Sequence, residues 1–129
     1  MSEPTRPEIG SIGWIDLTSP DAEVTRDFYA AVVGWKTQPV DMGEYSDFNM
    51  LAPASGEPKA GVCHARGANQ DIPAAWMIYI VVADLDASLA ACRERGGEIL
   101  GEPRSMGGAS RYAFIRDPAG ALCALYESA

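Results

Sequence analysis

The stretch Gly13–Trp35, GWIDLTSPDAEVTRDFYAAVVGW, contains the local signals that decide the fold. It reads as a short apolar strand, a turn rich in helix-capping residues, an amphipathic helix and a glycine that ends the helix. A weaker copy of the same pattern occupies Trp76–Gly97, WMIYIVVADLDASLAACRERGG. The aspartates near the two helix starts and the glycines after the helix ends are both 63 positions apart. The sequence therefore predicts that one unit of about half the chain occurs twice.

Composition limits the classes of protein to which the chain can belong. Its 129 residues suffice for one domain, or for two half-sized units that share a core. The net charge of −8 argues against a nucleic-acid partner, because such proteins usually present a basic patch. No apolar run approaches the ~20 residues of a membrane-spanning helix. The polar start, MSEPTRPEIGS, lacks the apolar segment of a secretory signal, so we expect a cytoplasmic protein without membrane partners.

Alternating apolar residues and turn signals predict the element order β-α-β-β-β, repeated once. In the first helix we expect a cap at Ser19, with Pro20 at the first helical position, and an end at Gly34. We expect the second helix to begin after Asp84 and to end at Gly96 and Gly97. The expected later strands lie at 36–42, 45–51, 59–65, 75–83, 98–100, 111–116 and 121–127, with a loop at 101–110. The predicted modules are residues 1–67, including a loose N-terminal lead-in, and 68–129, together forming one structural domain.

Each predicted helix has an apolar stripe that should pack on its own sheet. The stripe of the first helix consists of Val24, Phe28, Ala31 and Val32, and that of the second of Leu85, Leu89 and Cys92. We expect the first stripe to meet Ile15 and Leu17, which leaves Trp14, Asp16 and Thr18 on the opposite face of the first strand. The three cysteines, Cys63, Cys92 and Cys123, are widely spaced and should pack as small hydrophobes.

The element order, the segment DFYAAVVGW and the ending FIRDPAGALCALYE resemble the vicinal oxygen chelate superfamily, which includes glyoxalase I, extradiol dioxygenases and bleomycin resistance proteins. The resemblance covers roughly Gly10 to Glu127. It implies an α+β fold in which two tandem βαβββ modules form a curled mixed sheet around a cleft. It also implies a homodimer.

The resemblance further implies metal ligands at set places on the first and last strands of each module. A histidine is expected seven residues before each helix-opening aspartate, where this chain has Trp14 and Met77. A glutamate is expected seven residues after the aspartate of the DPxG turn, where it has Ala124. The remaining position falls on Gly61 or His64, depending on the loop alignment. Since a divalent ion needs several nitrogen or oxygen ligands, we expect neither a metal nor another cofactor.

Strand alternation assigns a set of mainly aromatic and apolar residues to the cleft, and we expect Phe48, Met50, Tyr112 and Phe114 as additions to it. Such a lining suits a flat or hydrophobic small molecule. The alternative is that these side chains simply fill a closed core, although an inward carboxylate at Asp16 would need a partner or water. The predicted ligand-binding residues are Trp14, Asp16, Phe48, Met50, Met77, Tyr79, Tyr112, Phe114, Ala124 and Tyr126.

Two classes of function follow, and a purely structural role is a third. The composition of the cleft favours a metal-free protein that binds a small hydrophobic or aromatic molecule, because no activated nucleophile or paired carboxylates are predicted there. The alternative is a lyase, isomerase or oxygenase-type enzyme of the same superfamily that uses Asp16, Tyr79 or His64 for acid/base chemistry. As the lone histidine, His64 reads either as an exposed or edge-strand residue or as a single acid/base or ligand-anchoring group.

Overall fold

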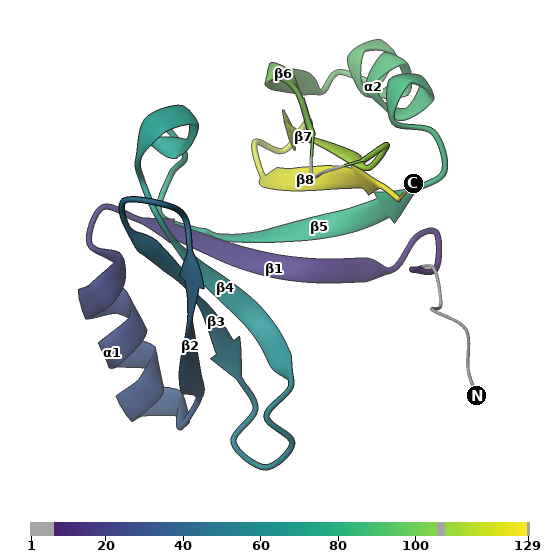
Figure 1. The fold of residues 1–129 in the computed structure, drawn as a ribbon. Coiled ribbons are helices and arrows are strands. Elements are labelled where there is room, and N and C mark those ends of the chain that lie inside the picture. Colours follow the sequence, from purple (N-terminus) through teal and green to yellow (C-terminus); the bar gives the residue numbers. More distant parts are fainter. Residues whose placement is uncertain (1–6, 106–107, 129) are drawn as a thin grey trace. The chain divides into compact units, whose positions relative to one another are not determined.

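The computed structural model describes residues 7–105 and 108–128, which form two compact α+β units (Figure 1). One unit spans Trp14–Trp76, and the other combines the described residues before Trp14 with those from Met77 onward. The division after residue 76 differs from the predicted module boundary at 67 and 68. Among the described residues, no helix has the length and apolar character required to span a membrane.

The unit Trp14–Trp76 is a four-stranded sheet with one α-helix. Its strands lie in the order β2-β3-β4-β1, with β1 parallel to β4 and the other neighbours antiparallel. The edge position of β2 confirms the expectation from Pro39, which cannot donate to a ladder. The elements are β1 (Ile12–Ser19, which begins in the other unit), α1 (Ala22–Val33), β2 (Lys36–Asp41), β3 (Ser46–Leu51), β4 (Pro58–His64) and a 3₁₀ turn, η1 (Gly67–Asn69).

The other unit repeats this topology in the order β5-β8-β7-β6, with β5 parallel to β8. Its β6 runs on to Ser105, although the sequence predicted a loop from residue 101. The extension forms because Arg104 and Ser105 pair with Tyr112 and Arg111 beyond a register shift. Residues 106 and 107 of the predicted loop lie outside the described residues. The elements are β5 (Trp76–Val82, which begins in the first unit), α2 (Leu85–Glu94), β6 (Glu98–Ser105), β7 (Arg111–Arg116) and β8 (Leu122–Glu127).

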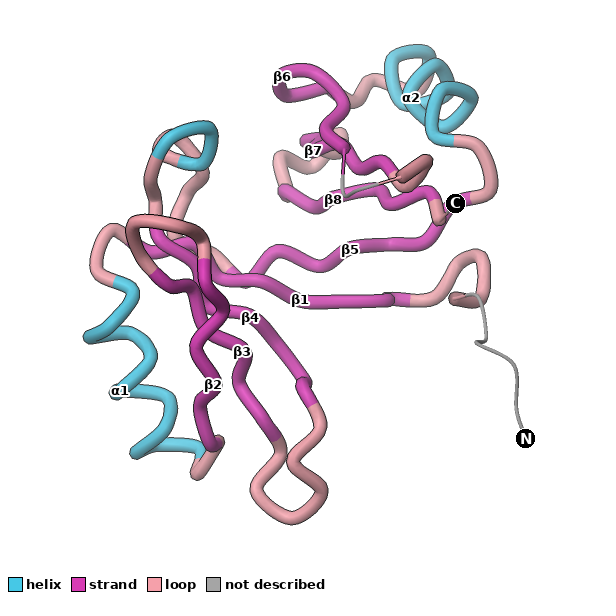
Figure 2. The backbone as a smooth tube through the Cα atoms, in the orientation of Figure 1, coloured by secondary structure: helices cyan, strands magenta, loops and turns pink. Residues whose placement is uncertain are grey.

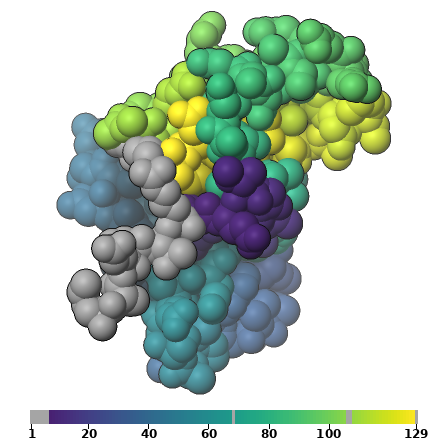
Figure 3. Space-filling view, turned by 90° about the vertical axis from the view of Figure 1, so that its right-hand side faces the viewer, coloured from purple at the N-terminus to yellow at the C-terminus, as the bar shows by residue number. Residues whose placement is uncertain are grey.

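The described N-terminal residues belong to this second unit because they bond to β5. The amide of Gly10 donates to the Val81 carbonyl at 2.8 Å, and the Val81 amide donates to Ser11 at 2.9 Å. Figure 3 shows these residues (purple) against green-coloured residues of the same unit. The predicted lead-in to the first module therefore joins the second unit in this region.

Local capping chemistry explains where α1 begins and ends. The N-cap is Asp21, whose carboxylate accepts from the Val24 amide, and not Ser19 as predicted. The Ser19 hydroxyl instead accepts from the Asp21 amide at 3.1 Å, in the turn that precedes the helix. Gly34 ends the helix in the left-handed conformation, with φ of 87°, as predicted. Asp84 caps α2 as predicted, and each helix follows its first strand after a short turn (Figure 2).

The two helices pack on their sheets through different residues: α2 through its leucines, and α1 through an alanine and a tyrosine. α2 buries Leu85 and Leu89 as predicted, in a cluster with Ala113 and Leu125. The predicted stripe of α1 is wrong in its direction, because its three larger side chains, Val24, Phe28 and Val32, are exposed. α1 instead contacts its sheet through Ala22 and Tyr29, which pack against the cluster of Phe48, Met50 and Val62.

Candidate functional site

The sheet face opposite α2 gathers the six predicted site residues of that unit. The register pairs Tyr79 with Ala124 and Ala124 with Phe114, so these three side chains lie side by side on one face. Tyr126 pairs with Tyr112 in the next row. The alternate positions pack under α2 in the cluster around Leu85 and Leu89. Met77 lies two positions before Tyr79 and shares its face. Strand alternation predicts this face for Met77, Tyr79, Ala124 and Tyr126, and the register places Tyr112 and Phe114 beside them.

Three aromatic rings on this face form a contact cluster. The Tyr79 and Tyr112 ring centroids are 5.8 Å apart, and Phe114 lies 6.3 Å from the first and 5.6 Å from the second. These separations fall within the range of favourable aromatic pairs. The guanidinium carbon of Arg104 lies 4.9 Å from the Phe114 ring centroid, which places a cation over the ring face. Tyr79 and Phe114 are buried, whereas Tyr112 and Arg104 are half-buried.

In the other unit, the face opposite α1 is polar. The Trp14 indole N–H donates to Asp16 Oδ1 at 2.5 Å. Asp16 lies beside Gly61 across the parallel β1–β4 pair, and a Cβ at Gly61 would overlap the same carboxylate oxygen. The glycine therefore leaves room for the carboxylate to lie over β4. The register continues this row through Asn49 and Gln38, whose amides share a hydrogen bond of 3.3 Å.

Cys63 lies on the same polar face, next to Thr18 in the register. Burial raises the pKa of its thiol, and the nearby carboxylates of Asp16 and Asp47 raise it further. A thiol held in this protonated form is a poor nucleophile. Cys63 thus fits the predicted packing role.

Phe48 and Met50 do not share the face of Trp14 and Asp16, contrary to the prediction. Phe48 pairs with Val62, which pairs with Leu17, and this row faces α1. Met50 is fully buried in the same cluster. The sequence does not specify the register of β3, and a shift of one residue reverses the face to which its side chains point.

His64 is held by carboxylates at both ring nitrogens. Its Nδ1 lies 3.1 Å from Asp47 Oδ1, and its Nε2 lies 3.2 Å from Glu23 Oε1. The Asp47 carboxylate also accepts from the His64 amide at 2.9 Å. The imidazole stacks edge-on against Tyr45, and only 12% of the side chain is exposed. These contacts link the start of α1 to β3 and β4, which is a structural role that sequence reasoning missed because both partners are distant in the chain.

The positions that carry metal ligands in related proteins do not offer a ligand set here. The Trp14 nitrogen bears the proton that it donates to a neighbouring carboxylate. Met77 offers only a thioether, and neither Ala124 nor Gly61 has a donor side chain. The alternative position, His64, has both nitrogens engaged. Across residues 7–105 and 108–128, no three or more His, Cys, Asp and Glu side chains cluster in a way that could hold a metal ion.

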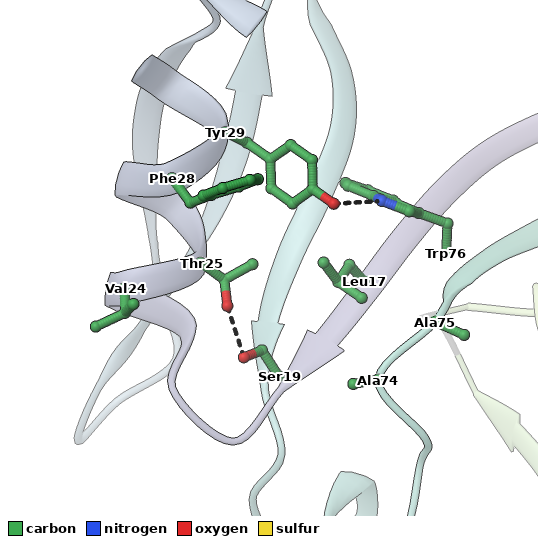
Figure 4. A pocket seen from close by; sticks show the side chains of 9 residues that line it. All are labelled: Leu17, Ser19, Val24, Thr25, Phe28, Tyr29, Ala74, Ala75 and Trp76. Atoms are coloured by element: carbon green, nitrogen blue, oxygen red, sulfur yellow. Dashed lines mark hydrogen bonds between the residues drawn. The ribbon is translucent and has the colours of Figure 1, made fainter. Parts of the chain in front are cut away.

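A pocket that the sequence did not predict lies between α1, β1 and the segment before β5 (Figure 4). Its volume is about 430 Å³. Its hydroxyl and indole groups bond to one another: Ser19 with Thr25 at 2.8 Å, and the Trp76 N–H to the Tyr29 hydroxyl at 3.1 Å. The remaining surface is apolar. The lining residues are Leu17, Ser19, Val24, Thr25, Phe28, Tyr29, Ala74, Ala75 and Trp76.

Two βαβββ units, each with a helix on one face of its sheet and candidate ligand residues on the other, define a class of small α+β proteins built by duplication. Within that class the family can be identified. Residues 11–125 match the model of the Glyoxalase/Bleomycin resistance protein/Dioxygenase superfamily, and the chain belongs to this family. The family assignment and the α+β fold expected from the sequence are thereby confirmed.

Two relatives agree with this assignment, and a solved structure shares the fold. The chain is 32% identical over 124 residues to "Putative glyoxylase CFP32" of Mycobacterium bovis, covering 92% of this chain and 46% of the relative. It is also 32% identical over 134 residues to "Anthracycline biosynthesis protein DnrV" of Streptomyces peucetius, covering 95% and 49%. The chain thus spans about half the length of these relatives. Methylmalonyl-CoA epimerase from Mycobacterium tuberculosis shares the fold, with a TM-score of 0.58, 19% identity, and coverage of 94% of this chain and 89% of that one.

Proposed function

We propose that this protein binds a small hydrophobic or aromatic molecule on the sheet face opposite α2, without a metal ion. The observation that carries the proposal is the cluster of Tyr79, Tyr112 and Phe114 with the Arg104 guanidinium over the Phe114 ring. An aromatic cluster that reaches the surface at the half-buried Tyr112 suits a flat apolar ligand, and the half-buried Arg104 at its margin suits one with an anionic substituent. The names of two relatives, a glyoxylase and an anthracycline biosynthesis protein, support small-molecule chemistry.

We also propose a ligand contact at Trp14 and Asp16 on the polar face of the other unit. There the indole-bound carboxylate would accept a hydrogen bond from a hydroxyl or amine. The metal-free part of the proposal is supported by the lack of donor atoms at Gly61 and Ala124. We further propose that the protein is a homodimer.

The ligand proposal can be tested with the fluorescent aromatic anion 8-anilinonaphthalene-1-sulfonate. Phe114 and Phe48 form a matched pair, because each ring is 6% exposed and each lies under a guanidinium, that of Arg104 or Arg26. Only Phe48 faces α1. We expect Phe114→Leu to weaken probe binding by roughly 5- to 30-fold, a loss of about 1–2 kcal/mol, and Phe48→Leu to leave it within twofold.

Urea unfolding first confirms that both variants are folded. If both then lose probe affinity equally, the binding site does not lie on the sheet face opposite α2. Metal analysis of the purified protein is a separate measurement. Stoichiometric zinc, nickel, manganese or iron would overturn the metal-free proposal whichever variant loses the probe.

A further inference from the structure

We propose that the outer face of α1, defined by Val24, Phe28 and Val32, is the surface on which a second copy of this chain docks. The inference rests on the homodimer proposed above and assigns its interface. Val24, Phe28 and Val32 are 62%, 56% and 63% exposed. Their spacing of four residues makes a continuous apolar ridge along the helix. A contiguous apolar surface of this kind marks an interaction site more often than an isolated exposed residue does.

The ridge is complementary to itself. It reads Val, Phe, Val in both directions, so a two-fold axis at Phe28 sets Val24 of one copy against Val32 of the other and Phe28 against Phe28. Ridges at a spacing of four residues are those that interdigitate in the commonest class of helix–helix packing. A partner that supplies the same ridge in antiparallel orientation is therefore a second copy of this helix.

The charges at the two ends of α1 support the same orientation. Asp21 caps its amino end, where Glu23 also lies within 3.2 Å of His64 Nε2, and the exposed Lys36 follows its carboxyl end. An antiparallel pair brings the acidic end of each helix toward the lysine of the other copy and aligns the helix dipoles favourably. Asp27, which lies beside the ridge, is already paired with Arg26 at 2.9 Å.

The pocket beside α1 provides space for a side chain from the second copy. Val24 and Phe28 are both part of its lining, and Figure 4 shows Val24 projecting from the outer side of the helix. Because the Ser19–Thr25 and Trp76–Tyr29 pairs already satisfy those polar groups, the pocket suits an apolar occupant. The two-fold arrangement would bring Val32 of the second copy to this edge.

Sedimentation equilibrium of the full chain tests the surface. We expect the wild type to be a dimer at micromolar concentration and Phe28→Lys to raise the dimer dissociation constant by roughly 30-fold or more. The matched control is Ala90→Lys, which adds the same charge at an exposed position of α2 and should leave the constant unchanged. Circular dichroism checks that both variants are folded.

Covalent trapping of the dimer gives a second measurement, which does not require the fold to tolerate a lysine at position 28. Under mild oxidation, Phe28→Cys should form a disulfide-linked dimer, whereas Ala90→Cys should show no more than the background of the native cysteines. A dimer that survives Phe28→Lys and is not trapped at residue 28 would overturn this surface but keep the homodimer. A monomeric wild type would overturn both, and probe binding lost in Phe28→Lys would then assign the pocket to a small apolar molecule.

Discussion

The two helices occupy equivalent places in two repeated units, yet they differ in what they bury. α2 turns Leu85 and Leu89 toward its sheet, where they are 0% and 5% exposed. α1 contacts its sheet through the small Ala22 and the aromatic Tyr29, and it presents its valines and Phe28 outward. α2 therefore resembles an ordinary surface helix, whereas α1 is apolar on two sides. A helix that is apolar on two sides can satisfy its own sheet and still offer a surface to a partner.

The sheet faces that point away from the two helices also differ: the one opposite α2 is aromatic, and the one opposite α1 is polar. Behind α2 lies the aromatic cluster around Phe114, whereas behind α1 lies a polar row through Asp16 and Asn49. Duplication thus kept the strand order while the two faces acquired different chemistry. The units can be tested separately, since a variant in one leaves the side chains of the other unchanged.

Truncation of the helix stripes should give the largest difference between the units. Leu89→Ala should lower the free energy of unfolding by about 2–5 kcal/mol, because it opens a cavity in a buried cluster. Val32→Ala should lower it by less than about 1 kcal/mol, because that side chain is 63% exposed. Urea unfolding at a protein concentration low enough to keep the chain monomeric measures both. Comparable losses would mean that the α1 stripe is buried within the monomer.

A smaller loss of unfolding free energy is expected from a substitution at Gly61 of β4, which lies beside the Asp16 carboxylate. Gly61→Ala should displace that carboxylate from the Trp14 indole and cost about 1–3 kcal/mol, because the new Cβ overlaps Asp16 Oδ1. The backbone at Gly61 is not in the left-handed region, so the steric overlap is the cause. Removing the carboxylate with Asp16→Ala should relieve the steric overlap. The double variant should then lose less free energy of unfolding than the two single variants lose in sum. Additive losses in urea unfolding would contradict this account.

Much of the fold was predictable because its signals are local and occur twice. The cap at Asp84, the left-handed Gly34 and the alternation in β5 each depend on a few neighbouring residues. Periodicity also revealed an apolar stripe on α1, but the prediction that this stripe meets the sheet was wrong. It could not say which side of a helix with two apolar faces meets the sheet, because Ala22 and Tyr29 compete with the valines.

The candidate site was predictable where strand alternation alone sets the face, as for Tyr79 and Ala124. It was not predictable where the outcome depends on register between strands, as for Phe48 and Met50. The carboxylates that hold His64 lie 17 and 41 residues away in the chain, and no local pattern in a single sequence indicates such contacts. The polar contacts of the first unit therefore required the structure.

The smallest predicted effect is a pH dependence confined to the unit that contains α1. A hydrogen bond from His64, with smaller contributions from the Glu23 amide and the charges of His64 and Arg26, lowers the pKa of the Glu23 carboxyl below 4.5. A lowered pKa in the folded state means that Glu23 stabilises the fold above the unfolded pKa and loses this contribution as the pH falls through the folded pKa. The urea midpoint of Glu23→Gln should therefore lie slightly below that of the wild type at pH 6, and the difference should shrink as the pH falls through the lowered pKa of Glu23. Asp27→Asn, on the same helix but without the histidine contact, is the control; an equal pH dependence there would attribute the effect to net charge.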